Sequence, residues 1–541
     1  MKIVCLVKQV PKPGAIEFDD ETKTLRREGV PLELNPFDRY AVQHAVALRE
    51  RMGGEVVALT MGPPQAEEAL REALELGADR AILLSDRVFA VADTLGTSRT
   101  LALALRKEGF DLVLCGKKTI DSETWQVPPE VAAFLDVPHV TNAIALEPGL
   151  RVTRMTDEAE EVWDVPTPAV VSAAAPPTNV PDSVAQSGKV ESWGARDLVD
   201  EVFEYDKRFG QTGSPTRVLA VRDVTPERTQ FRADSVEAAT AKVNELLVER
   251  TAPATSWDKP EHIAEQPGAY YDCWVLIETR DGGATRTSLE LLARARELAG
   301  KLGGSVVAPV LGDGADELGR HGAEIVHRVH FDGDPAEALR SVLERHRPHV
   351  LLIPATAWGR EVGPRAAGEL ELGMTGDCVG VDIAKAGRLL QQKPAYGGNI
   401  VSVIMGATTP QLATVRPRMY EPLEPRDGAQ PEERRERVET VAGPRPTLVE
   451  RRPHERPGWT IDEAATVVVR GDEPPQLRVG LLGRTIAPRV LVAVGLEGTV
   501  EELSGFVKAA VIVSVGGGAE MSERADVIFD GDEGELLSAL E

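Results

Sequence analysis

Four polar side chains gather in one loop that directly follows an apolar strand, residues 110–115. They are Asp121, Ser122, Thr124 and Gln126. A helix opens behind them at Pro128-Pro129, and a helix N-terminus with unpaired N–H groups is a binding site for an anion such as a phosphate. The same residue types also suit an N-cap, which needs no ligand. The loop therefore predicts either an anion site or a capped helix start.

A second loop of this kind lies in the other half of the chain. The apolar run from His349 to Pro354 leads into a loop that holds Thr356, Trp358, Gly359 and Arg360, and we expect a short helix with residues 365–372 as its body. Such strand–loop–helix edges are where open α/β sheets place their ligands. The alternative is a buried loop whose glycines serve packing alone.

Strands and helices must alternate around these loops to position them. In the first 140 residues we expect strands at 2–7, 55–60, 80–84 and 110–115, with helices between them. The strands are apolar throughout, which is typical of a parallel sheet buried on both faces. Alternating strands and helices of 10–15 residues predict βαβ units.

An internal repeat extends this architecture to the second half. LRERMGGEVVALTMG at 48–62 returns as LAGKLGGSVVAPVLG at 298–312, and FDLVLC before the first loop returns as PHVLLIP before the second. We therefore expect two homologous α/β domains. A Pro- and Ala-rich run at 252–267 would join them.

Composition excludes several classes of function. The chain has 541 residues, enough for three or four domains, and a net charge of −25, which argues against nucleic acid and anionic membranes as partners. Its four cysteines are far apart and indicate reduced thiols and a cytoplasmic location, and no apolar run is long enough to span a membrane. GxSxG, P-loop and HExxH patterns are missing, so a nucleotide hydrolase or ligase is not favoured.

Several motifs together resemble the electron transfer flavoprotein family. GREVGPRAAGELELGMTGDC, KPAYGGNI and ATVRPRMY, within residues 354–420, are similar to its α subunit. NPFDRYAVQHA, TMGPPQAEEALREALELGADRAI and GKKTIDSETWQVPPEVAAFLDVP are similar to its β subunit, and GSPTRVLAVRDVTPERTQ resembles that subunit's C-terminal arm. The chain thus resembles a β subunit fused to an α subunit.

The resemblance implies an α/β fold with two Rossmann-like domains, of the adenine nucleotide α-hydrolase-like type, whose parallel sheets meet in pseudo-twofold contact as an internal pseudo-heterodimer. A small α/β flavoprotein domain would follow them. The expected divisions are a β-like domain with its arm (1–250), a linker (251–268), an α-like domain (269–423), a charged Pro-rich linker (424–463) and a truncated FAD-binding domain (464–541).

In this family, loops of the β subunit hold an adenine nucleotide. The resemblance places that site at Leu6, Asn35, Met61, Gly62, Gly116, Asp121, Thr124, Gln126 and Val127. Val127 resembles members that hold a second FAD here in place of AMP. Trp125 stands where AMP-binding members have a small polar residue, so it would either stack on the base or fill the site.

The C-terminal domain departs from the family at its flavin site. The resemblance places FAD contacts at Gly480, Gly483, Thr485, Gly495 and Gly498. One polar element of the family is missing, and Glu497, Glu501 and Glu502 replace neutral or basic side chains, although carboxylates repel a pyrophosphate. We expect this site to be degraded. Phe37 would either lie against the flavin ring or be a core aromatic residue.

The resemblance implies an electron carrier, not a substrate-converting enzyme. It would use FAD, with AMP or a second FAD in the β-like half, to pass electrons from a flavin-dependent dehydrogenase to a quinone-reducing or other acceptor protein. The alternative is a nucleotide-binding or docking scaffold that has lost its redox flavin. The replaced recognition loop Pro176-Pro177-Thr178-Asn179-Val180 and the altered C-terminal site favour that alternative.

Overall fold

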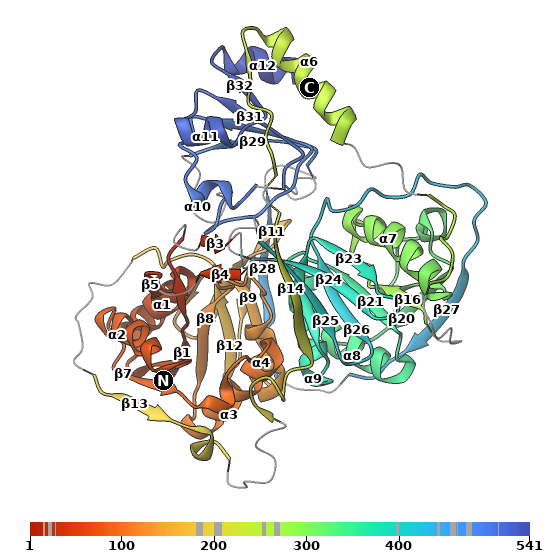
Figure 1. The fold of residues 1–541 in the computed structure, drawn as a ribbon. Coiled ribbons are helices and arrows are strands. Elements are labelled where there is room, and N and C mark those ends of the chain that lie inside the picture. Colours follow the sequence, from red (N-terminus) through yellow and green to blue (C-terminus); the bar gives the residue numbers. More distant parts are fainter. Residues whose placement is uncertain are drawn as a thin grey trace.

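The computed structural model describes most of the chain, which folds as two α/β halves side by side with a smaller sheet domain above them (Figure 1). No helix within the described part is long and apolar enough to cross a membrane. Residues 396–399 of the KPAYGGNI motif and Val180 of the replaced loop lie outside it. The described residues are 1–13, 17–19, 24–26, 29–179, 188–199, 208–224, 226–250, 256–263, 271–395, 400–440, 444–454, 461, 464–471, 479–506 and 508–540.

The first half is built on a ten-stranded sheet. The strands pair in parallel from β13 as far as β9 and antiparallel from there to β28. The four predicted strands are β1, β6, β7 and β8, and apolar clusters cover both faces of the sheet. The spatial order is β13 (Val190–Trp193), β7 (Arg80–Leu84), β6 (Glu55–Met61), β1 (Lys2–Leu6), β8 (Leu112–Gly116), β12 (Ala169–Ala173), β9 (His139–Glu147), β10 (Arg151–Met155), β11 (Ala159–Asp164) and β28 (Thr447–Pro453).

Four helices connect these parallel strands. They are α1 (Pro36–Met52), α2 (Glu67–Glu75), α3 (Thr94–Glu108) and α4 (Val127–Leu135). Pro36 begins α1, where its missing N–H costs nothing. The Asp93 carboxylate caps α3 by accepting the Gly96 N–H at 3.0 Å. Two small hairpins, β2 (Gln9–Pro11) with β5 (Leu32–Leu34) and β3 (Glu17–Asp19) with β4 (Thr24–Arg26), lie between β1 and α1.

The second half repeats the strand order of the first, as two homologous α/β domains would. Its seven strands are parallel, in the order β22 (Met374–Cys378), β26 (Gln411–Val415), β21 (Val350–Pro354), β16 (Cys273–Val275), β19 (Val306–Leu311), β20 (Ile325–His330) and β27 (Glu432–Arg437). The helices are α7 (Arg286–Leu302), α8 (Pro335–His346) and α9 (Gly359–Glu369). Strands β16, β19, β20, β21, β26 and β22 stand where β1, β6, β7, β8, β12 and β9 stand in the first sheet.

The helix expected with residues 365–372 as its body begins earlier, at Gly359, and ends at Glu369. The Thr356 hydroxyl accepts the Gly359 N–H at 3.1 Å. Gly359 is required at this start, since a Cβ would lie 1.9 Å from the Pro354 carbonyl oxygen.

The C-terminal arm of the first half joins the other two units. Strand β14 (Thr216–Asp223) forms a four-stranded antiparallel sheet with β25 (Ile400–Gly406), β24 (Leu389–Ala395) and β23 (Gly380–Ile383). Farther along, β15 (Phe231–Ala233) and α6 (Val236–Arg250) pack on the C-terminal domain (Figure 1). Residues 231–250 therefore belong structurally to that domain.

The C-terminal domain is a five-stranded parallel sheet. Its order is β15, β32 (Val527–Phe529), β31 (Val511–Val515), β30 (Val490–Val494) and β29 (Thr466–Arg470), and its own helices are α10 (Val500–Leu503), α11 (Ala519–Glu523) and α12 (Glu533–Leu540). Four of these strands, β29 to β32, lie within residues 464–541. The fifth strand comes from the arm.

The charged run at 424–463 contributes strands to both halves. β27 extends the second sheet beside β20, and β28 extends the first sheet beside β11. Both strands are largely exposed and contain acidic and basic residues side by side. The sequence-based expectation of a simple exposed linker missed this edge pairing.

Candidate functional site

The two loops singled out by their polar residues meet between the halves. Gly116 ends β8 and Pro354 ends β21, at equivalent places in the two sheets. The helices that follow, α4 and α9, pack against each other. Gly368 allows this contact, because a Cβ there would lie 3.0 Å from the Ala133 Cβ and 3.3 Å from the Glu130 Cα.

Gln126 joins the halves through its side-chain amide. Nε2 donates to the Met374 carbonyl oxygen at 3.0 Å, and Oε1 accepts the Gly376 N–H at 3.0 Å. Gly376 has to be a glycine here, because a Cβ would lie 2.3 Å from the Thr124 carbonyl oxygen. The predicted nucleotide ligand Gln126 is therefore an interface residue in this structure.

Two buried carboxylates, Glu123 and Asp377, anchor a charge network across the same interface. Glu123 Oε2 lies 3.0 Å from Lys118 Nζ and 3.4 Å from Arg416 Nη2. Asp377 accepts from Arg416 Nε and Arg360 Nη2, each at 2.6 Å. Burial alone would raise the pKa of Asp377, but Arg360 and Arg416 hold it well below its usual range.

Lys393 adds a further cation to this network. Its Nζ donates to the Glu123 carbonyl oxygen at 3.0 Å. Burial lowers the pKa of Lys393 to about 8, against the attraction of Asp377 and Glu123. Within the described residues, five cationic side chains and two carboxylates thus surround the junction: Lys117, Lys118, Arg360, Lys393 and Arg416 with Glu123 and Asp377.

Trp125 lies among these cations. The Arg360 guanidinium is 4.4 Å from the centroid of its ring, and the Lys117 and Lys118 ammonium groups are 5.1 and 5.7 Å away. The Trp125 Nε1 and Asp121 Oδ1 atoms are buried without a hydrogen-bond partner in the described part of the chain. Buried unpaired polar atoms of this kind are uncommon and fit an additional ligand.

The predicted nucleotide residues of the first half gather at one edge of its sheet. Leu6, Met61 and Gly116 end the neighbouring strands β1, β6 and β8. Gly62 follows β6, and its N–H bonds to the Leu84 carbonyl oxygen. Asp121 pairs with Lys8 at 2.6 Å. Thr124 lies in the loop between this edge and α4, and Val127 is the first residue of α4.

Asn35 and Asp38 hold the loop at this edge from the start of α1. Asn35 Nδ2 donates to the Lys118 carbonyl oxygen at 3.0 Å, and its Oδ1 accepts the Ile120 N–H at 3.3 Å. The Asp38 carboxylate accepts the Gly116 and Lys8 N–H groups at 2.8 and 2.9 Å. Burial raises the pKa of Asp38 to about 7. Asp38 was not predicted as a site residue from the sequence. Its position in the NPFD motif, which begins at Asn35, was the feature that could have indicated it.

The start of α4 is a weaker anion site than the sequence analysis assumed. Val127, Pro128 and Pro129 are its first three residues, and the two prolines have no N–H to donate. Any anion at this helix end would depend on the side chains of Lys117, Lys118 and Arg360.

Phe37 is fully buried and contacts the C-terminal domain. It packs with Val10, Ile120 and Leu481, and Leu481 belongs to the turn after residues 472–478. Of the two positions expected for Phe37, against a flavin ring or in the core, this structure shows the core position. Its ring also lies 5.0 Å from Lys117 Nζ, so it adjoins the cationic junction.

The glycine turns of the C-terminal domain already have partners for their amides. Gly480, Gly483 and Gly495 donate to backbone carbonyl oxygens, and the Gly498 N–H donates to Glu502 Oε2 at 2.8 Å. Glu502 also accepts the Thr499 N–H and so caps α10. With these amides engaged, and Glu497, Glu501 and Glu502 beside them, the turns do not fit a pyrophosphate.

Thr485 faces a different neighbour, Arg416 of the second half. Together with Met419 and Lys508 they line a cavity of about 10 Å³, enough for one water. Burial lowers the pKa of Lys508, and Arg416 and Arg228 lower it further. Lys508 is a cation that the sequence analysis did not single out.

The two parallel sheets and the loops that meet between them define an α/β protein of the Rossmann-like type. The electron transfer flavoprotein domain family matches residues 22–198 and 273–444, and this chain belongs to that family.

Several known proteins are similar in sequence to the N-terminal half of this chain. The electron transfer flavoprotein subunit beta of Thermoanaerobacterium thermosaccharolyticum is 42% identical over 235 residues, which are 42% of this chain and 90% of that protein. FixA of Sinorhizobium fredii is 40% identical over 266 residues, 46% of this chain and 92% of its own. CarD of the caffeyl-CoA reductase-Etf complex of Acetobacterium woodii is 44% identical over 177 residues, 32% and 68% of the two chains.

Proposed function

We propose that this chain is a fused electron carrier, in which a β-like half and an α-like half, related by a pseudo-twofold axis, bind FAD where their loops meet. The family is one of electron transfer proteins. The observation that carries the proposal is the cationic junction around Trp125, with its unpaired indole N–H and the unpaired Asp121 oxygen.

This donor set suits the parts of an adenine nucleotide. The Trp125 ring offers a stacking surface, and Lys117, Lys118 and Arg360 offer charge to phosphates. Bound FAD would supply the acceptance and donation of electrons. The residues of the chain would bind and orient it, and the packed interface would exclude water.

A flavin-dependent dehydrogenase as donor and a quinone-reducing or other protein as acceptor are part of the proposal. AMP or FAD in the β-like half are both compatible with the loop residues. The C-terminal glycine turns have no part in it, since their amides are engaged within the domain.

A scaffold without redox flavin is the second candidate, and two observations favour it. Leu481 of the C-terminal domain packs on Phe37, and Glu502 takes the amides of the Gly498 turn. An absorption spectrum of the purified chain, with chromatography of the nucleotide released on heating, separates the two. We expect flavin bands and about one FAD per chain. A colourless protein that releases AMP supports the scaffold, and a protein that releases no nucleotide contradicts both.

The position of the nucleotide is tested by Trp125→Ala. We expect this variant to retain less than a tenth of the nucleotide. Trp163→Ala is the matched control, because Trp163 also has an arginine, Arg154, at 5.0 Å from its ring but lies on β11. Equal retention by both variants would place the nucleotide elsewhere.

A further inference from the structure

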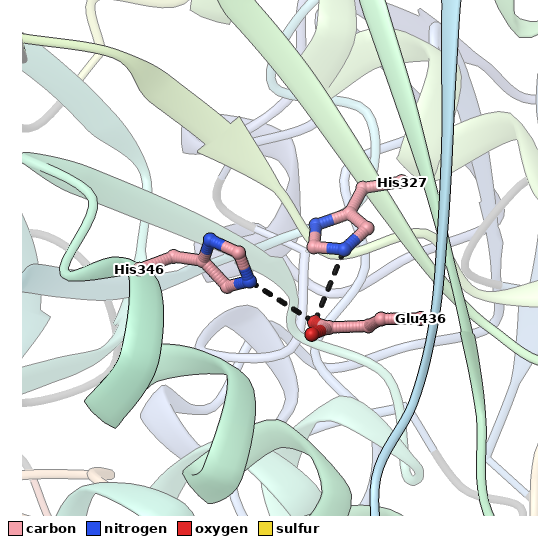
Figure 2. A group of neighbouring side chains, drawn as sticks. All are labelled: His327, His346 and Glu436. Carbon is pink, nitrogen blue, oxygen red and sulfur yellow. Dashed lines mark hydrogen bonds and ion pairs between the residues drawn. The ribbon is translucent and has the colours of Figure 1, made fainter.

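Three side chains that can bind metal converge at the outer edge of the second sheet (Figure 2). His327 lies on β20, His346 at the end of α8, and Glu436 on the edge strand β27. Both histidine Nε2 atoms are 3.1 Å from the same carboxylate oxygen, Glu436 Oε1. The three ligand atoms lie within 4.8 Å of one another.

The spacing is that of ligands around a small divalent ion. For metal–ligand bonds of about 2.1 Å, two ligand atoms 3.1 Å apart subtend about 95° at the ion, between the octahedral and the tetrahedral angle. The two imidazole rings are 4.9 Å apart and nearly perpendicular, at 87°. Their nitrogens can therefore approach one ion without the rings overlapping.

The surroundings hold the ligands in place and leave one side open. Trp274 packs against both rings, with centroids 5.8 and 5.7 Å away. Glu436 Oε2 is 2.6 Å from Arg345 Nη1, which leaves Oε1 directed to the histidines. His327 is buried, whereas the His346 side chain is one-third exposed. Solvent thus reaches the cluster past His346.

The charges around the cluster act on a bound cation in opposite directions. Arg345 and Arg434 repel it, and the carboxylate of Glu436 offsets that repulsion.

We propose that His327, His346 and Glu436 bind one divalent transition-metal ion, with Zn²⁺ as the best fit. Two imidazoles and one carboxylate are a common protein ligand set for zinc, with water in the remaining position. The ion would tie β27, which leads towards the C-terminal domain, to β20 and α8. It would therefore fix β27, an edge strand that is otherwise largely exposed, to the rest of the sheet.

Cobalt(II) chloride, added to the full chain after removal of metals with a chelator, tests the site. We expect d–d absorbance to saturate at one Co²⁺ per chain and to be removed by ZnCl₂. His346→Gln and Glu436→Gln should each weaken binding at least tenfold. His330→Gln is the matched control, because His330 lies on the same strand but outside the cluster.

The thermal midpoint gives a second readout, since an ion that binds only the folded state stabilises it. ZnCl₂ should raise the midpoint of the parent chain and of His330→Gln, but not that of the two ligand variants. Absence of Co²⁺ binding by the parent chain would overturn the proposal. Binding that is unchanged in His346→Gln and Glu436→Gln would overturn it as well, because the metal would then lie elsewhere.

Discussion

Gln126 Nε2 donates a hydrogen bond of 3.0 Å to the carbonyl oxygen of Met374, and Gln126 Oε1 accepts another from the neighbouring Gly376 N–H. Both partners are buried. We predict that Gln126→Ala lowers the free energy of unfolding by about 2–4 kcal/mol, since a carbonyl and an amide are left unpaired. Urea unfolding of the full chain measures this. The exposed Gln211→Ala should change little, and equal midpoints for the two variants would contradict the prediction.

Asp526 fixes the arm of the first half to the C-terminal domain. Its buried carboxylate lies 2.9 Å from Arg228 Nη1 and 2.9 Å from Arg250 Nη2, and it also accepts the Ile512 N–H at 2.9 Å. Asp526→Asn leaves two cations without their anion, so we expect a loss of about 3–5 kcal/mol. Hydrogen exchange should become faster in β15 and α6.

Asp530→Asn is the control for this variant. Asp530 contacts Arg232 nearby, but both side chains are exposed, and exposed pairs contribute about 0–1 kcal/mol. If β15 and α6 exchange at the parent rate in Asp526→Asn, strand pairing and apolar packing hold the arm without the ion pairs.

The repeat and most strands could be predicted from sequence because they are local patterns. An apolar run such as Val350–Pro354 is buried on both faces, and in an α/β chain such a run predicts a strand of a parallel sheet. The edge strand β27 has no such pattern, since both of its faces are exposed and its sequence is EERRER. Its opposite charges give the one signal, since Glu433 pairs with Arg328 of β20.

The site could be predicted only in part. The sequence indicated the loop after β8, because its polar residues lie close together in the chain. It could not predict the contacts of Gln126 with Gly376 or of Glu123 with Arg416. These partners lie more than 200 residues apart in the chain, and no local sequence pattern indicates that they pair. Asp38 was missed because its partner amide, that of Gly116, lies 78 residues farther along the chain.

Glu130 should make stability depend on pH. Burial raises the pKa of this carboxyl group to about 8, and the hydroxyl of Ser98 donates to it at 2.8 Å. The folded state therefore holds a proton that the unfolded state releases near pH 4.5. The stability from this group is complete below pH 4.5 and is lost as the pH rises towards 8.

Glu130→Gln removes this titration, because a neutral amide stands where the protonated acid stood. We predict that the variant gains stability relative to the parent between pH 5 and pH 8, by on the order of 1–3 kcal/mol at the upper end. Thermal midpoints across this range measure the difference. Glu147→Gln, at an exposed position on β9, should follow the parent curve. Parallel curves for Glu130→Gln and the parent would show that Glu130 is ionised in the folded protein.

Leu481 is expected to control the docking of the C-terminal domain onto the first half. It is buried against Phe37, Val10 and Ile120, and these four side chains form a separate cluster. Leu481→Ala would leave a cavity there, at a cost of about 2–4 kcal/mol. Since Leu481 is not part of the apolar clusters of the C-terminal sheet, this cost should weaken docking and leave the sheet intact.

Hydrogen exchange distinguishes docking from folding. In Leu481→Ala, the amides of residues 118–120 should exchange faster, while those of β30 keep the parent rate. Leu496→Ala is the matched control, because Leu496 lies in the core of the C-terminal domain and should accelerate exchange in β30. If Leu481→Ala leaves residues 118–120 unchanged, Phe37 and Ile120 are held by the first half alone. The contact with Leu481 would then have no part in placing the C-terminal domain.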